Sequence, residues 1–288
     1  MKQLKHVIAA DLFPVSLSHS GFMERIVSDS GCMIVRQESG RATLRAPTEL
    51  ILESLLAQIN ERVQSPVKAG SCYVLYLETI TRSAEAEGKE IRQSKERDHY
   101  GHVRLTLDPQ ELGEQFQFIN AIQHGAIPEV FIPTIQQAIS KGLQKGVLKG
   151  FPVVEVACTL FDGSYHDIDS SDEAFEKATL RALADGLSKA APVLLEPIMR
   201  FEIRAPEELI PSVLADLKKR RAKIEEADAS LHEGLVKGFI ALAQVLGYHR
   251  VLEKMTDARA QLTLHPDHYA RVLEEDSPDF PPAIAIAL

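Results

Sequence analysis

The chain has 288 residues, of which 45% are hydrophobic and 25% are charged, and its formal net charge at pH 7 is −9. This composition is typical of a globular protein, and the length is enough for two or three domains. The sequence contains no apolar run of about eighteen residues, and the stretch MKQLKHVIAADL lacks the apolar core of a signal peptide. We therefore expect a cytoplasmic protein with no membrane-spanning helix. Because the chain is acidic, any contact with nucleic acid requires a local basic patch.

The first predicted segment, residues 1–75, alternates strands with helices. Two runs of alternating polarity flank a Ser-Gly turn at 38–41 and predict a hairpin. Pro47 opens a helix whose apolar residues recur at helical period as far as Val63. Strands are predicted at 6–10, 32–37, 42–46 and 73–80, and helices at 20–29 and 47–63. This order is the split β-α-β-β-α-β arrangement.

The second predicted segment, residues 76–192, begins with two strands that the polar stretch 93–99 joins. Its other predicted elements are a helix after Pro133 with Ile135, Ile139 and Leu143 on one face, a strand at 153–161, and a helix that ends near Lys189.

A loop at 162–169 joins the last strand of this segment to its last helix. Gly163 is expected to let the chain turn sharply after the strand. Ser170 and Glu173 are expected to form a capping box at the start of the helix. The loop is therefore predicted to stand on a rigid support.

The third predicted segment, residues 193–288, repeats the split β-α-β-β-α-β order. Pro211 lies inside its first predicted helix and is expected to bend or shorten that helix. The Pro-rich end of the chain, from residue 274 onward, is expected to be poorly ordered. Strands are predicted at 199–205, 223–230, 235–242 and 260–265, and helices at 206–221 and 243–255.

The sequence contains no motif that indicates an enzyme. It lacks GxxxxGK[ST], the loop that cradles nucleotide phosphates, and it lacks the HExxH spacing of zinc proteases. The acid pairs Glu85/Glu87 and Glu225/Glu226 fit solvated faces rather than buried carboxylates with tuned pKa values. We therefore expect no catalytic residue and no cofactor.

Cysteines and histidines offer no recognisable metal site. Cys32, Cys72 and Cys158 are scattered and form no CxxC pair, so each is interpreted as a small buried hydrophobic side chain. His265 and His268 lie close together but fit a solvated turn better than a pair of ligands. We therefore expect no bound metal.

Several stretches of the sequence resemble elongation factor G, a translational GTPase. YLETITRSAEAEGKEIRQSKERDHYGHVRLTLDP resembles the start of that family's domain IV, and GSYHDIDSS at 163–171 is close to its GSYHD-x-DSS. GYHRVLEKMTDARA is similar to domain V, and residues 1–75 resemble domain III more weakly, through SDSG and RAPTELILESLLAQI. The resemblance covers about residues 5 to 270. It implies an α+β architecture of three consecutive modules: ferredoxin-like ones at 1–75 and 193–288, flanking a domain IV at 76–192 that is similar to ribosomal protein S5.

The resemblance implies that the first loop is a tip that enters the decoding centre beside tRNA and mRNA. The flat rings of Tyr165 and His166 are suited to stacking on RNA bases. His166 matches the position of the modified histidine in the eukaryotic relative. The residues alone also fit a plain turn whose histidine faces water. The expected tip residues are Gly163, Ser164, Tyr165, His166 and Asp167.

A second tip loop departs from the family's pattern. The family typically has SGGRGQYGHV where this chain has SKERDHYGHV at 94–103. The glycines are replaced by Lys95, Glu96 and Asp98, and the two new carboxylates would face RNA phosphate. This puts efficient translocation in doubt, and a loop that has lost its function is the alternative. The residues assigned to this loop are Lys95, Arg97, His99, Tyr100 and Gly101.

The densest basic run of the chain lies in the third segment. The resemblance places it at a helix-to-strand turn of domain V that contacts large-subunit rRNA. The alternative is a positively charged helix end that the helix dipole favours. The expected rRNA-binding residues are Lys218, Lys219, Arg220, Arg221 and Lys223.

The resemblance implies binding to the ribosome, through rRNA at the factor-binding site and through tRNA and mRNA in the A site. The family's GTPase domain would lie N-terminal to this chain in a longer protein. One functional class is a module that supports translocation, which the GSYHDIDSS run favours. The other is a stand-alone paralogue without a GTPase that occupies the factor site and blocks, protects or regulates the ribosome. The glycines lost at Lys95, Glu96, Asp98 and Ala258 favour that second class, and a binding protein that reuses the fold elsewhere stays open as a third.

Overall fold

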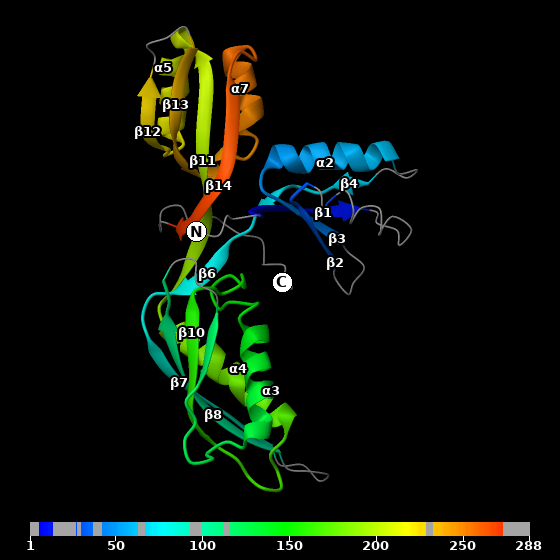
Figure 1. Cartoon of the computed structure of the whole chain (residues 1–288), viewed down its shortest axis with the longest axis vertical. Coiled ribbons are helices and arrows are strands. Elements are labelled where there is room, and N and C mark those ends of the chain that lie inside the picture. The colour runs from blue at the N-terminus through cyan, green and yellow to red at the C-terminus, as the bar shows by residue number, and fades with distance from the viewer. Residues whose placement is uncertain are drawn as a thin grey trace. The chain divides into compact units, whose positions relative to one another are not determined.

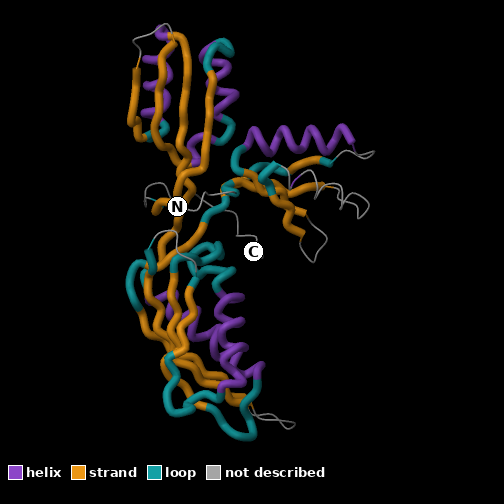
Figure 2. Tube along the Cα trace, viewed as in Figure 1, coloured by secondary structure: helices purple, strands orange, loops and turns teal. Residues whose placement is uncertain are grey.

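A computed structural model of the chain describes residues 6–13, 27, 30–36, 42–62, 67–92, 99–111, 116–228 and 233–272. Helices and strands are mixed throughout, which confirms the α+β class (Figures 1 and 2). The chain forms two compact units, one of Met1–Leu75 with Glu196–Ala270 and one of Tyr76–Leu195 with Arg271–Leu288. The division into three domains stays a prediction.

The first sheet has the strand order β2-β3-β1-β4, with β5 also paired to β1. Its elements are β1 (Ile8–Phe13), β2 (Met33–Arg36), β3 (Ala42–Ala46), α2 (Glu49–Arg62), β4 (Lys68–Ala69) and β5 (Tyr73–Val74). The helical period predicted α2 correctly, because Leu52, Leu55 and Ile59 are all buried. The predicted hairpin of β2 and β3 is confirmed as an antiparallel pair. The helix expected at 20–29 lies outside the described residues apart from Val27, and so does the hairpin turn.

The strand predicted at 73–80 is wrong as a single element. The chain changes sheets after β5, and β6 (Leu77–Ile80) pairs antiparallel with the start of β11 (Pro192–Pro206). A continuous run of β-forming residues carries no signal for such a change, because the partner strand decides it and lies far along the chain.

The second sheet carries the order β7-β8-β10-β9, in which only the β9–β10 pair is parallel. Helices α3 and α4 supply Ile135, Ile139 and Phe175 to one core with Leu105 and Leu107 of the sheet. We call the opposite side of this sheet the open face. The elements are β7 (Ala84–Arg92), β8 (His99–Pro109), β9 (Gln117–Asn120), η2 (Glu129–Phe131), α3 (Ile132–Gly142), β10 (Val156–Ser164) and α4 (Asp172–Lys189).

At two glycines, helix α4 lies so close to the backbone of β7 and β8 that no side chain fits between them. A Cβ atom built on Gly101 would lie 2.7 Å from the carbonyl carbon of Ala174. One built on Gly88 would overlap the carbonyl oxygen of Ala178. Both glycines are buried, and they set how closely the helix approaches the sheet.

A buried carboxylate holds the loop that follows α3. Glu78 is 1% exposed and accepts N–H groups from Leu148, Lys149 and Phe151 at 3.0, 2.9 and 3.1 Å. Its own backbone N–H donates to the carbonyl of Pro152 at 2.8 Å. Three donors around one carboxylate compensate the loss of its hydration.

The third sheet has the order β12-β13-β11-β14, which repeats the order of the first sheet. Pro211 lies in the first turn of α5, after a short 3-10 turn, so the expected shortening of that helix is confirmed. The helix expected at 243–255 is instead two helices, because Gly247 adopts φ +68° between them. The elements are η3 (Glu207–Leu209), α5 (Ile210–Lys219), β12 (Lys223–Asp228), β13 (Glu233–Ala241), α6 (Leu242–Val245), α7 (Tyr248–Thr256) and β14 (Gln261–Arg271). The Pro-rich end lies outside the described residues.

Glu78→Gln is expected to lower the free energy of unfolding by about 2–4 kcal/mol, because one amide oxygen cannot accept all three N–H groups and each orphaned donor costs about 1–3 kcal/mol. Urea titration of the full chain measures this change. Glu85→Gln is the matched control, since that carboxylate is exposed on β7 and its replacement should change stability by at most about 0.5 kcal/mol. Equal midpoints for the two variants would show that the carboxylate does not hold the loop.

Candidate nucleic-acid interface

The first tip loop is shorter than the sequence predicted. Strand β10 continues through Ser164, and Gly163 pairs with Val103 of β8 instead of turning. Gly163 does not have a positive φ, so the sharp turn expected there is wrong. The glycine is needed for packing, because an added Cβ would lie 2.5 Å from the side chain of Ile127.

The serine that caps α4 is Ser171 and not Ser170. The side chain of Ser171 accepts the N–H of Ala174 at 3.3 Å, so the capping box expected from Ser170 is wrong. Ser170 instead has its hydroxyl between the loop and the sheet, where it donates to the carbonyl of Tyr100 at 3.0 Å and accepts the N–H of His166 at 2.9 Å. This serine therefore fastens the loop to β8.

The loop exposes four consecutive residues, 165–168, to solvent, and three of them carry rings or an apolar side chain. Tyr165 is 42% exposed, the side chain of His166 is 58% exposed, and Ile168 is 75% exposed. His166 Nδ1 lies 2.9 Å from a carboxylate oxygen of Asp169, and its ring centroid lies 6.4 Å from that of Tyr100. Sequence reasoning missed Ile168, although an apolar residue within a polar run was the available signal.

Residues assigned to the second tip loop divide between two places. Lys95 and Arg97 lie outside the described residues, whereas His99, Tyr100 and Gly101 belong to strand β8. For those three residues the loop assignment is wrong, because Gly101 is held under the first turn of α4. The strand brings Tyr100 against the first tip loop, so the two predicted regions meet here.

The basic run at the end of α5 is not uniform. Lys218, Lys219, Arg221 and Lys223 are exposed. Arg220 is half-buried and is tied down by its neighbours. Its guanidinium donates to the carboxylate of Asp216 at 2.8 Å and to the carbonyl of Gln244 at 2.7 Å, and it lies 4.5 Å above the ring of Tyr248. Arg220 is therefore held by contacts within the module, unlike the other four basic residues, which are exposed to solvent.

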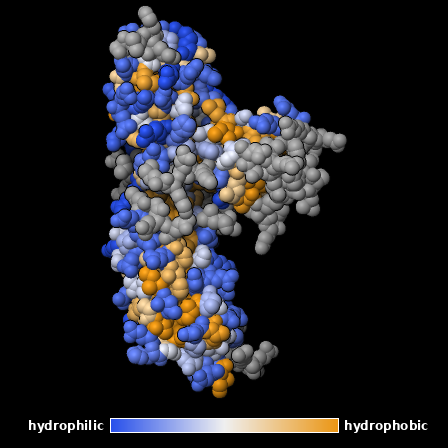
Figure 3. All heavy atoms as spheres, in the orientation of Figure 1, coloured by the Kyte–Doolittle hydropathy of each residue, from blue (hydrophilic) through white to orange (hydrophobic). Residues whose placement is uncertain are grey.

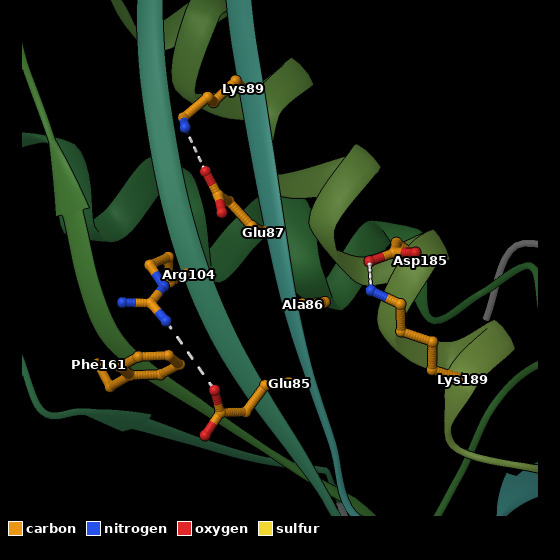
Figure 4. A pocket seen from close by; sticks show the side chains of 8 residues that line it. All are labelled: Glu85, Ala86, Glu87, Lys89, Arg104, Phe161, Asp185 and Lys189. Carbon is orange, nitrogen blue, oxygen red and sulfur yellow. Dashed lines mark hydrogen bonds and ion pairs between the residues drawn. The ribbon is translucent and has the colours of Figure 1, made fainter.

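An open hollow of about 490 Å³ lies beside β7 (Figure 4). Its cations face carboxylates within the hollow: Lys89 pairs with Glu87, Arg104 lies 4.0 Å from Glu85, and Lys189 lies 2.5 Å from Asp185. A hydrogen bond from Lys89 lowers the pKa of Glu87. The hollow is a solvated charged surface, and its internal pairing makes it a poor site for a phosphate.

The surface is mostly hydrophilic in the view of Figure 3. Within the described ranges, no helix is both long and apolar enough to cross a membrane. The same ranges hold no group of three His, Cys, Asp or Glu residues arranged for a metal.

Cys32 and Cys158 are buried as predicted, whereas Cys72 is half-buried. Burial raises the pKa of Cys158 to about 12, so this thiol is unreactive at neutral pH.

Two family models match the chain in succession. The model of elongation factor G, domain IV, matches residues 72–191, and the model of the elongation factor G C-terminus matches residues 193–279. A crystal structure of a protein from Thermus thermophilus superimposes with a TM-score of 0.70 at 31% identity, and covers 96% of this chain and 42% of that one.

A curated relative gives the same result. The elongation factor G of Fervidobacterium nodosum is 39% identical over 241 residues, which make up 84% of this chain and 35% of that protein. The chain thus spans about a third of the length of this relative. The two domain matches and this relative agree, and the chain belongs to the elongation factor G family as a translation-factor module that carries domain IV and the C-terminal domain.

Proposed function

We propose that the chain binds the ribosome in the cytoplasm at the factor-binding site and directs the tip of its domain IV toward tRNA and mRNA in the A site. The observation that carries this proposal is the tip loop: Tyr165, His166 and Ile168 are exposed, while Ser170 fastens the loop to β8. A loop that is already ordered loses little conformational freedom when it binds, and this favours affinity.

The charges of the tip indicate which parts of RNA it contacts. Residues 165–169 carry the carboxylates of Asp167 and Asp169 and no lysine or arginine. Carboxylates repel phosphates but accept hydrogen bonds from base edges and ribose 2′-hydroxyls. The tip therefore fits bases and riboses, with the ring of Tyr165 or His166 stacked on a base.

Phosphate contacts are assigned to the C-terminal domain. Lys218, Lys219, Arg221 and Lys223 are exposed at the end of α5 and the start of β12. Lysine and arginine side chains on an otherwise acidic protein supply the local positive patch that rRNA binding requires.

The second candidate is a factor without a GTPase that occupies the same site and blocks, protects or regulates the ribosome. The observation that favours it is the substitution of glycine in the second tip stretch and at Ala258. Ala258 still adopts φ +56°, a conformation that glycine takes at lower cost. The chain keeps the left-handed turn at position 258, although alanine stands there in place of the glycine that suits it.

Co-sedimentation with 70S ribosomes tests both candidates. Binding is expected with or without GTP, because the 288 residues contain no phosphate-cradling loop. A full-length elongation factor should displace the chain. Stimulated tRNA movement in a translocation assay supports the first candidate, and inhibition supports the second. No co-sedimentation at low salt contradicts both.

His166→Ala is expected to leave the melting temperature almost unchanged and to weaken ribosome binding. Loss of one base–aromatic stacking interaction costs about 1–3 kcal/mol, whereas an exposed ion pair contributes at most about 1 kcal/mol to folding. His268→Ala is a matched control away from the tip. Its side chain is 48% exposed, lies 2.8 Å from Asp267, and packs against an aromatic ring. Equal ribosome affinity of the two variants would contradict an RNA contact at His166.

Replacing both Lys218 and Lys219 with Ala is expected to weaken ribosome binding. The salt dependence should fall by about one counterion for each phosphate that is no longer neutralised. Affinities measured across a salt series give this slope. Lys254→Ala is the control, since Lys254 is also exposed and also lies in the last turn of a helix. Arg220→Ala should act mainly on stability, because it removes the contacts with Asp216 and Tyr248. An unchanged slope for the double variant would rule out phosphate contacts there.

A further inference from the structure

Four side chains on the open face form a connected polar row directly below the tip. Tyr100 Oη lies 2.7 Å from Ser164 Oγ, and Ser164 Oγ lies 2.8 Å from His102 Nδ1. His102 Nε2 lies 3.1 Å from Glu87 Oε1. That last contact is off the line of a straight hydrogen bond, so it is chiefly electrostatic. The row joins β7, β8 and β10 and runs from Glu87 to Tyr100, and its member Ser164 directly precedes Tyr165 of the tip.

The carboxylate at one end of the row decides the direction of every hydrogen bond in it. Glu87 is ionised at neutral pH, since Lys89 lowers its pKa, and a carboxylate can only accept. A neutral His102 therefore keeps its proton on Nε2, which leaves Nδ1 as an acceptor. Ser164 must then donate to Nδ1, and its oxygen accepts the hydroxyl proton of Tyr100. This arrangement gives Tyr100, Ser164 and His102 Nδ1 a hydrogen-bond partner each, while the Nε2 proton is held near Glu87 by electrostatic attraction.

We propose that His102 and Ser164 are positioning residues of the tip, which hold Tyr100 beside His166 through this one-way row of hydrogen bonds. The inference rests on the proposed binding of the tip to ribosomal RNA or tRNA. The ring of Tyr100 contacts that of His166, and the carbonyl of Tyr100 accepts the hydroxyl of Ser170. Tyr100 is therefore held at its hydroxyl, at its ring and at its backbone, and its ring packs beside the exposed ring of His166.

The charged groups around His102 come from all three strands. Glu87 and Lys89 face it from β7 and Asp162 from β10, while Arg104 is its neighbour on β8. Burial lowers the pKa of His102 and the charge of Lys89 lowers it further, against the opposing effect of Glu87 and Asp162. The neutral form that the row requires is therefore the form present at neutral pH.

Protonation of His102 reverses the row. Nδ1 then becomes a donor, and Ser164 can no longer donate to it. Because the pKa of folded His102 lies below the value of about 6.5 for an unfolded histidine, the unfolded chain binds more protons between the two values. The free energy of unfolding consequently falls as the pH drops through this window, and His102→Gln should remove this part of the pH dependence.

A ribosome-free experiment tests the row itself. Long-range ¹H–¹⁵N NMR of the full chain at neutral pH should show His102 with its proton on Nε2. In Glu87→Gln the amide can donate as well as accept, so the form protonated on Nδ1 should gain population. Glu85→Gln is the matched control, because Glu85 lies on the same strand face and contacts Arg104 instead. A wild-type His102 protonated on Nδ1 would overturn the one-way row.

Ribosome binding tests the positioning role. Ser164→Ala should bind about three- to tenfold more weakly, the equivalent of one lost hydrogen bond. The ribosome affinity of the wild type should also fall as the pH is lowered and His102 becomes protonated. This pH step in affinity should be absent in Ser164→Ala and in His102→Gln. Ser164→Thr keeps the hydroxyl and should restore both affinity and pH profile. Ser188→Ala, at an exposed serine of α4, is the control.

The outcomes separate this inference from the proposed function. If the wild-type chain does not sediment with ribosomes, the proposed function fails, and the positioning role fails with it even where NMR finds the row. If the wild type binds but Ser164→Ala matches it in affinity and pH profile, the positioning role is wrong and ribosome binding stands. Loss of affinity in Ser164→Ala without loss of the pH step would also overturn it, since a merely structural defect produces that pattern.

Discussion

The close approach of α4 to strands β7 and β8 is the contact on which the tip depends. The tip loop leaves β10 after Ser164 and enters α4 at Ser171, so the sheet fixes one end and the helix fixes the other. Gly88 and Gly101 let the helix lie directly on the strand backbone. A side chain at Gly101 would push away the first turn of α4, and the hydrogen bond from Ser170 to Tyr100 of β8 would be lost with it. The exposed residues of the loop are therefore placed by packing beneath them.

Local pattern predicted most of the second sheet, because burial along its strands alternates. In β8, Gly101, Val103, Leu105 and Leu107 are buried while the residues between them are half-buried, and such alternation is legible in the sequence. Where an element is defined by a distant partner, local pattern failed. The run at 73–80 reads as one strand but serves two sheets, because β1 pairs with its first half and β11 with its second.

In the candidate site, too, the local sequence predicted some features, whereas others depend on residues far along the chain. Exposure of Tyr165 and His166 could be predicted, since a short polar stretch between a buried strand and a capped helix has to lie at the surface. The roles of Gly163 and Ser170 could not. Both residues obey the local rules for a turn and a cap, yet Ile127 and Tyr100 determine what they do. Arg220 shows the same limit. Its place in a basic run suggests a side chain as exposed as those of its neighbours, whereas the contact with Tyr248 keeps it half-buried.

In the proposed function, charge divides RNA recognition between the two domains. Salt-dependent affinity comes from lysine and arginine contacts with phosphates, which carry little information about the sequence or shape of the RNA. The exposed basic residues at the end of α5 fit that role, and the carboxylates of the tip exclude it there. A tip that gains little from phosphate attraction has to obtain its binding energy from stacking and from hydrogen bonds to bases and riboses, and these interactions fall off within ångströms. The tip can then contribute to affinity only if it is precisely placed, and the glycine contacts, Ser170 and the row from Glu87 to Tyr100 all help to place it.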